Sequence, residues 1–365
     1  MIHICLTICK YFFLYLYFMS IKYLLIFIVV IVILFIFMYL SNYLTDTFDS
    51  QIVGSKADLT HSKAEVDYYL NDYIDSFKDP KIRELNKYVL ENGKRVRSII
   101  MLSIFKKLNG TQTMNKGIIH AIISIELIQS ASLIIDDIMD DDKTRRDKEC
   151  LHVKHGNTMA QLIAIQLTSN AFKNLCSSIR ELSQNNIINK NLPVIFFSFI
   201  SENLDDLVIG QYKDIDMQKD IKSVGNNIKN LLKKSNVDIE EVIHQKTSSL
   251  FIISFVLPWL LSNPNLTDNA LKTGISKLTH IAKNFGLLFQ IADDFEDVEQ
   301  DLRRDGKNVA MNYVICRGET KAYSRYQNLV NNFVLESNKI GIYNSELEAI
   351  ITYLNNKVEQ NRKTL

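Results

Sequence analysis

The sequence predicts an all-α fold: a single large helical domain around a central cavity, preceded by an N-terminal transmembrane helix. Three observations lead to this prediction. The 365 residues include only four prolines and twelve glycines, too few turn-forming residues for an all-β domain. Apolar residues recur at helical spacing through most of the chain. The start of the chain contains a long uninterrupted apolar run.

The first segment, residues 1–45, is predicted to anchor the chain in a membrane. Residues 23–45 carry no charge, and the run 24–40 is almost wholly Ile, Leu, Val and Phe. About 20 apolar residues suffice for a helix to cross a bilayer. A cleaved signal peptide is the alternative, but no A-x-A-like site follows this long run. Two lysines ahead of the span are too few to fix its orientation, and Met19 offers a second start site.

The rest of the chain is predicted to form a polar linker, residues 46–62, and one helical domain, residues 63–365. Near the start of that domain, Val66, Leu70 and Tyr73 follow helical spacing. The range 117–135 is nearly all apolar, which predicts a buried central helix. Further helical runs are expected over 160–182, 192–216, 237–261 and 271–301.

Charge and cysteine content exclude several classes of protein. The chain has 42 basic and 41 acidic residues, so its net charge of +1 predicts no surface for nucleic acid. Its five cysteines are odd in number, scattered, and free of any CxxC pair. This pattern favours reduced thiols over a disulfide framework or a structural zinc site.

A cluster of aspartates ends the predicted central helix. Asp136, Asp137 and Asp140 are spaced so that their carboxylates converge on one helical face. Such a cluster is costly to hold near an apolar helix unless a cation neutralises it, and oxygen-only ligands suit Mg²⁺ shared with a phosphate. Arg145 and Arg146 follow, and their forked donors suit the same diphosphate. The alternative is a solvated acidic helix end.

A second cluster repeats the spacing at the end of another apolar helix. Asp293, Asp294 and Asp297 again follow the pattern DDxxD. Two such clusters facing each other across a cavity would hold a diphosphate between magnesium ions. The metal ions would stabilise the negative charge that develops on a departing diphosphate.

Five short motifs occur in order along the chain, and together they are far more specific than any one alone. They are GKRVR (93–97), DDIMD with RR (136–146), GQYKD (210–214), KT (246–247) and FQIADDFED (289–297). With this set and order, the chain over about residues 63–313 resembles the trans-isoprenyl diphosphate synthases. The sequence just before Asp136 looks most like that of geranylgeranyl diphosphate synthases.

The resemblance implies Mg²⁺-dependent, head-to-tail condensation of isopentenyl diphosphate with an allylic diphosphate. It also implies a homodimer and three Mg²⁺ in each active site. The implied metal ligands are Asp136, Asp137, Asp140, Asp293, Asp294 and Asp297.

Two substrate sites and a catalytic set are implied by the same resemblance. The implied substrate-binding residues are Gly93, Lys94, Arg97, Gln129, Arg145, Arg146, Lys246, Thr247, Gln290 and Lys307. The implied catalytic residues are Asp136, Gln211, Lys246, Thr247 and Asp293. Among these, Lys246, Thr247 and Gln211 are expected to stabilise an allylic cation in a dry cavity.

The chain departs from the family pattern in two places. After Arg146 the family continues G-x-P, whereas this chain has Asp147-Lys148-Glu149. His152 falls where the family places a histidine, and a solvated loop histidine is the alternative. The loop before Lys307 is short and lacks the usual lysine, so Arg303 or Arg304 are candidate substitutes.

The length of the product should depend on the depth of the apolar cavity below the first cluster. Ala131 and Ser132 lie about one helical turn before Asp136, where farnesyl-making relatives commonly place aromatic rings. Small residues there favour a C20 product, geranylgeranyl diphosphate. The alternative is that they only permit close helix packing.

Some of the same residues would also suit other functions. A synthase that stops at C15 or makes longer polyprenyl chains is the nearest alternative. A terpene cyclase would normally lack GKRxR and the second DDxxD, and a non-catalytic partner subunit usually loses one or both clusters. A membrane scaffold with a helical domain is a third class.

Overall fold

Helices account for nearly all of the described chain, which comprises residues 59–110, 115–185, 188–223, 238–303 and 312–363 of a computed structural model. The predicted all-α domain is confirmed for these residues. The anchor over 1–45, most of the linker, and Lys307 lie outside them. Residues 59–62, expected as the end of the linker, are already helical.

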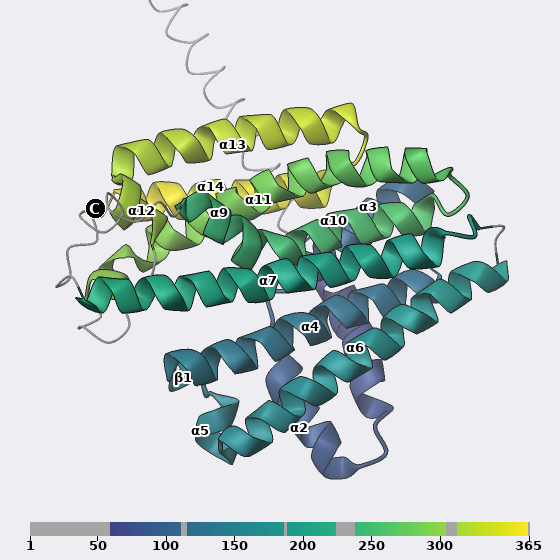
Figure 1. Cartoon of the computed structure of the whole chain (residues 1–365), viewed down its shortest axis with the longest axis horizontal. Coiled ribbons are helices and arrows are strands. Elements are labelled where there is room, and N and C mark those ends of the chain that lie inside the picture. Colours follow the sequence, from purple (N-terminus) through teal and green to yellow (C-terminus); the bar gives the residue numbers. More distant parts are fainter. Residues whose placement is uncertain (1–58, 111–114, 186–187, 224–237, 304–311, 364–365) are drawn as a thin grey trace, which may run out of the picture. The chain divides into compact units, whose positions relative to one another are not determined.

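The first described helix covers residues 59–75. The labelled helices before the short hairpin are α2 (Pro80–Leu90), α3 (Val96–Asn109) and α4 (Lys116–Asp140) (Figure 1). The hairpin pairs β1 (Thr144–Arg145) with β2 (Lys148–Glu149). After it come α5 (Leu151–His155), α6 (Asn157–Asn185), α7 (Leu192–Ser223), α9 (Ile239–Ile243), the π-helix η1 (His244–Ser248), α10 (Ser249–Ser262), α11 (Asp268–Arg303), α12 (Tyr313–Arg317), α13 (Glu319–Lys339) and α14 (Ser345–Arg362).

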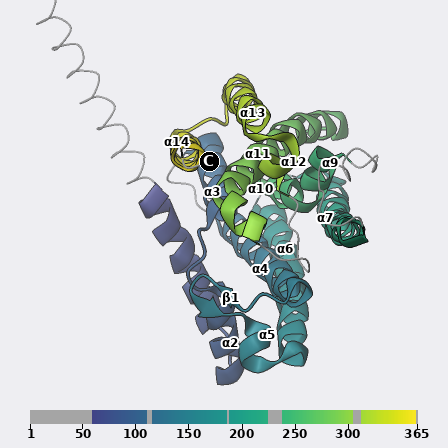
Figure 2. The ribbon, with the colours of Figure 1, turned by 90° about the vertical axis from the view of Figure 1, so that its left-hand side faces the viewer.

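The helix α4 runs through the centre of the fold, as the apolar range 117–135 predicted. It packs against α3, α6 and α10, and both views place it between α10 and α2 (Figures 1 and 2). The side chain of Asn115 caps its start by accepting from the amide of Ile118. Within the described residues, α4 is the one helix long and apolar enough to cross a membrane, but 67% of its most apolar stretch is buried.

A second part of the core lies between α10, α11 and α13. Phe255, Phe285 and Phe333 are fully buried, and their ring centres lie 5.0–5.9 Å apart. Contacts of this kind stabilise the core beyond the burial of apolar area alone. This packing fixes α11, which carries the second aspartate cluster, against α10 and the π-helix that precedes it.

The three described cysteines are Cys150, Cys176 and Cys316, and none forms a disulfide.

Candidate active site

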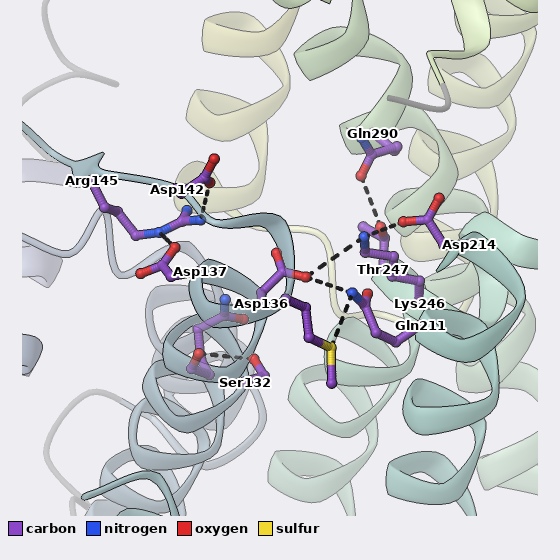
Figure 3. A network of polar contacts seen from close by, with 12 residues as sticks. Ser132, Asp136, Asp137, Asp142, Arg145, Gln211, Asp214, Lys246, Thr247 and Gln290 are labelled. Atoms are coloured by element: carbon purple, nitrogen blue, oxygen red, sulfur yellow. Dashed lines mark hydrogen bonds and ion pairs between the residues drawn. The ribbon is translucent and has the colours of Figure 1, made fainter. Parts of the chain in front are cut away.

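The three aspartates of the first cluster, in the last turns of α4, have different surroundings. Asp136 accepts a hydrogen bond from Nε2 of Gln211 over 2.7 Å. Asp137 is buried and accepts from Nε of Arg145 over 2.5 Å (Figure 3). Burial raises the pKa of Asp140 to about 6, and repulsion from Asp136 adds to the rise. The convergence expected for all three carboxylates therefore holds for Asp136 and Asp140, whereas Asp137 is occupied by Arg145.

The hairpin after α4 positions the arginine pair. Its two turn residues, Arg146 and Asp147, have φ angles of 54° and 61°. This left-handed pair is the geometry of a two-residue hairpin turn that favours Asn-Gly. Asp147 stands where the family pattern has glycine and adopts a left-handed conformation that glycine takes readily, so the hairpin forms without the G-x-P sequence. Arg146 reaches back to the carbonyl of Glu91 at 3.4 Å, next to the GKRVR segment.

A π-helical turn presents the Lys246-Thr247 pair to the site. The π-helix η1 packs directly against α7, and Gly210 makes this approach possible. A Cβ at Gly210 would lie 2.3 Å from the backbone nitrogen of Lys246. Single π-helical turns inside longer helices are frequent at functional sites because the extra residue shifts the side chains that follow. The glycine of GQYKD therefore has a packing role that brings Gln211 beside Lys246.

Lys246 joins two acidic residues of different helices. Its ammonium contacts Asp214 of α7 at 2.5 Å and Asp136 of α4 at 3.9 Å. Burial alone would lower the pKa of Lys246, but Asp214 and Asp136 outweigh it and raise the pKa. Lys246 therefore stays charged next to the first cluster. Sequence reasoning did not assign Asp214, although it is the last residue of GQYKD.

The second cluster shows a similar division on α11. Both oxygens of Asp294 are occupied, because Oδ1 accepts from Gln290 over 2.8 Å and Oδ2 accepts from the amide of Tyr313 over 2.6 Å. Burial raises the pKa of Asp294 to about 7. Burial also raises the pKa of Asp297 to about 6, and Asp301 and Asp293 add to it by repulsion. In each cluster the second aspartate is held by partners within the domain, and the first and last aspartates, four residues apart on one helical face, are the candidate metal ligands.

A chain of polar contacts runs from the π-helix to the second cluster, and Figure 3 shows its first link, from Thr247 to Gln290. The hydroxyl of Thr247 donates to Oε1 of Gln290 over 2.8 Å, and Gln290 donates onward to Asp294. Because Lys246 precedes Thr247 and contacts Asp136, one two-residue segment touches the networks of both clusters. The structure thereby brings together residues from four of the predicted motifs.

The GKRVR segment contributes a buried arginine that sequence reasoning left without a role. Arg95 has a left-handed backbone (φ 59°) and pairs with Glu126 at 2.8 Å and Asp67 at 2.8 Å. Gly93 accommodates this guanidinium, because a Cβ there would lie 2.3 Å from Nη1 of Arg95. Gly93, predicted to bind substrate, therefore makes room for a structural arginine. The isolated Glu126 in the apolar α4 was the available signal for such a partner.

Two residues predicted to bind substrate have buried polar atoms without partners. Nε of Arg97 and Oε1 of Gln129 lack a hydrogen bond to any described residue. The Arg97 guanidinium lies 4.2 Å from the ring centre of Phe251. Burial lowers the pKa of Arg97 to about 10, although Glu126 and Asp293 oppose this. An unpaired buried polar group is costly, so a water molecule or a ligand is expected to complete the hydrogen bonding of these two side chains. Lys94 lies nearby in sequence and is exposed.

Among the described residues, no three His, Cys, Asp or Glu side chains are already arranged to hold a metal ion. The donor set nevertheless fits Mg²⁺. It consists of carboxylates that repel one another, and Mg²⁺ normally binds through one or two carboxylates together with water and substrate phosphates. Asp136, Asp140, Asp293 and Asp297 are the residues that would hold it.

Comparisons with known proteins point to the same family as the motifs. A model of the polyprenyl synthetase family matches residues 79–313. The trans-prenyltransferase of African swine fever virus (isolate Pig/Kenya/KEN-50/1950) is 27% identical over 268 residues, 71% of this chain and 71% of the viral protein. The geranylgeranyl diphosphate synthase of Sulfolobus acidocaldarius is 28% identical over 259 residues, 67% of this chain and 69% of that enzyme.

A solved structure shares the fold. The geranyltransferase of Helicobacter pylori, crystallised with magnesium and isoprenyl diphosphate, superposes with a TM-score of 0.57 at 21% identity and covers 83% of this chain and 98% of its own. The domain thus has the isoprenoid synthase fold. With the family match over most of the chain, the conclusion is that this protein is a prenyltransferase that belongs to the polyprenyl synthetase family.

Proposed function

We propose that the protein condenses isopentenyl diphosphate head to tail with allylic diphosphates and releases geranylgeranyl diphosphate. The observation that carries the proposal is the segment Lys246-Thr247, which contacts Asp136 on one side and, through Gln290, Asp294 on the other. Residues of both aspartate clusters are thereby linked around one point. A diphosphate bound there would have acidic groups on two sides and Lys246 beside it.

The allylic diphosphate would be bound with Mg²⁺ held by Asp136 and Asp140 on α4 and by Asp293 and Asp297 on α11. Three ions for each active site is the number we propose. When bound, Mg²⁺ would neutralise the diphosphate and stabilise the charge that develops as it leaves. Arg145 would remain near the first cluster, because Asp137 orients its guanidinium.

Isopentenyl diphosphate would bind on the α3 side of the site. Arg97 and Gln129 have the unpartnered polar atoms that a diphosphate and its bridging water would satisfy. Arg146 is held next to this region by its contact with Glu91, and exposed Lys94 can swing onto the same anion. Arginine suits this role because its fork matches phosphate oxygens.

The allylic cation would form next to Thr247 and Gln211. The proton of the Thr247 hydroxyl is donated to Gln290, so the lone pairs of its oxygen are left for the cation. A carbonyl or hydroxyl dipole of this kind stabilises positive charge in a site from which water is excluded. The diphosphate that has left would then take the proton lost when the new double bond forms.

A C20 product is the chain length that the residues below Asp136 favour. Ala131 is buried and Ser132 is half-buried, and the Ser132 hydroxyl donates to the carbonyl of Gln129 over 2.9 Å. The hydroxyl is thus satisfied within α4, and both side chains are small. The family includes products of several lengths, so the carbon number is our proposal.

We further propose that residues 1–45 anchor the enzyme in a membrane and that the helical domain forms a homodimer. The uncharged apolar run supports the anchor. Four large apolar residues of α6 that are exposed in the single chain support a dimer surface. They are Met159, Leu162, Ile165 and Phe172.

Radiolabelled isopentenyl diphosphate tests the proposed function. Purified full-length protein in detergent, given farnesyl diphosphate and Mg²⁺, should form a labelled C20 diphosphate. Excess EDTA should abolish the product. A C15 or longer product would correct the chain length alone, whereas undiminished turnover in EDTA would overturn the metal-dependent mechanism.

A further inference from the structure

A buried lysine near the C-terminus reaches the second aspartate cluster. Lys357 lies in the last turns of α14 and is only 6% exposed. It is buried on α14 together with the apolar residues Ile350, Leu354 and Val358, which pack the helix against the rest of the domain. A lysine at such a position is unusual, because burying an ammonium is costly unless it is paired.

The ammonium of Lys357 has two acidic partners, both on α11. It contacts Oδ1 of Asp293 and Oε2 of Glu296. Asp293 is the first aspartate of the second cluster and a proposed metal ligand. Glu296 lies outside the aspartate pattern and is the more exposed of the two, at 52% against 31%. Arg97 also interacts electrostatically with Asp293.

A metal ion held by Asp293 would compete with this ammonium for the same carboxylate. Mg²⁺ held there would place a second cation beside Lys357, and two neighbouring cations repel each other. Lys357 cannot simply lose its partner, since an unpaired buried charge is strongly destabilising. Glu296 offers the alternative, because the flexible lysine stem allows the ammonium to remain with Glu296 alone.

We propose that Lys357 is an internal counter-ion that holds Asp293 until metal binds and then remains with Glu296. It is a positioning residue, and its proposal rests on the proposed function because it takes Asp293 as a metal ligand. Two consequences follow for the affinity of the second cluster. Removing Lys357 removes a competitor and should tighten metal binding. Removing Glu296 takes away the second partner of the lysine and should weaken it.

This affinity is measured without turnover by titrating the protein with Mn²⁺ alone and monitoring the electron paramagnetic resonance signal of the free ion. All the proteins compared are full-length, in detergent, and share the background substitution Asp136→Asn, so that the second cluster dominates the Mn²⁺ binding. Lys357→Met should bind Mn²⁺ about threefold or more tightly, on the scale of one ion pair, and Lys357→Arg should match the unchanged lysine. Arg362→Met is the matched control, since Arg362 lies on α14 as Lys357 does but pairs with Glu319 of α13.

The acidic partner is tested by a second comparison. Glu296→Gln should weaken Mn²⁺ binding more than Glu299→Gln, which removes the same charge from α11 three residues later. In the Lys357→Met background this difference should vanish, because the lysine no longer needs a second partner. If Lys357→Met does not fold, the comparison of Glu296→Gln with Glu299→Gln decides by itself.

Unchanged or weaker binding in folded Lys357→Met, or equal effects of the two glutamate substitutions, would overturn the proposal. Asp293→Asn separates this failure from failure of the proposed function. If Asp293→Asn loses the Mn²⁺ site while Lys357→Met behaves as the parent, only the counter-ion role is wrong. If Asp293→Asn binds as the parent does, Asp293 is not a ligand and both proposals fail.

Discussion

The side-chain amide of Gln211 donates a hydrogen bond to Oδ1 of Asp136 over 2.7 Å, which fixes the first aspartate of α4 toward α7. The next residue, Asp137, accepts from Arg145 instead. Neighbouring aspartates of one motif thus have different partners. On an α-helix consecutive side chains are about 100° apart, so adjacent residues do not share a face.

This difference predicts unequal effects of substitution within the first cluster. Asp136→Asn should lower kcat on the order of a hundredfold or more, the cost of removing one group that stabilises developing charge. Asp137→Asn should lower kcat less than about tenfold and instead reduce stability by about 1–3 kcal/mol, since Arg145 loses its buried partner. Steady-state kinetics and urea unfolding of both variants check this. Equal losses of kcat would show that Asp137 also acts on the metal or substrate.

A substitution at Lys94 tests the proposed site for isopentenyl diphosphate. Lys94→Ala should raise KM for isopentenyl diphosphate about tenfold and leave kcat within about threefold, because ground-state binding is what the lysine would supply. Lys107→Ala, on α3 but outside the motif, is the control. A change in KM for the allylic substrate alone would place Lys94 in the other site.

Filling the space below Asp136 tests the chain-length proposal. The double substitution of Ala131 and Ser132 by Phe should shift the product from C20 towards C15, because two rings would occupy the path of the growing chain. If no cavity exists there, overpacking should cost about 1–3 kcal/mol at each site. Product analysis and melting temperature are measured together. An unchanged C20 product in a folded variant, or loss of folding, would remove the support for C20.

The raised pKa of Asp140 predicts a pH-dependent stability of the metal-free protein. The pKa of the Asp140 carboxyl group is about 6 in the folded protein, above its pKa in the unfolded chain. Such a group stabilises the fold at pH values below the unfolded pKa, and this contribution is lost as the pH rises through about 6. Asp140→Asn should therefore raise the melting temperature by about 2–4 °C at pH 7.5 and by clearly less at pH 4.5. Asp75→Asn, on an exposed site of the first helix, is the control. An equal gain at both pH values would assign the effect to something other than titration.

The sequence was sufficient to locate the helices, because their amphipathic periodicity is a local property. The predicted ranges 192–216 and 271–301 fall inside α7 and α11, and the two aspartate clusters lie at the C-terminal ends of α4 and α11 as expected. The π-helical turn at Lys246 could not be predicted. It depends on the approach of α7 at Gly210, which is a tertiary contact.

The partners of the charged residues were beyond sequence reasoning for the same reason. Helical spacing allowed Asp137 and Asp294 to be ligands, but their hydrogen bonds to Arg145 and Tyr313 arise from segments that fold back onto the helix. Lys357 lies 64 residues after Asp293 and belongs to no motif. Only the packing of α14 against α11 brings it to the cluster.

The most direct test of the two-cluster account is a crystal structure with Mn²⁺ and a non-hydrolysable allylic diphosphate analogue. Anomalous scattering locates each ion without assumptions about its ligands. The account predicts ions on Asp136 and Asp140 and on Asp293 and Asp297, all sharing oxygens of one diphosphate. Ions confined to one cluster, or a diphosphate bound away from Lys246, would contradict it.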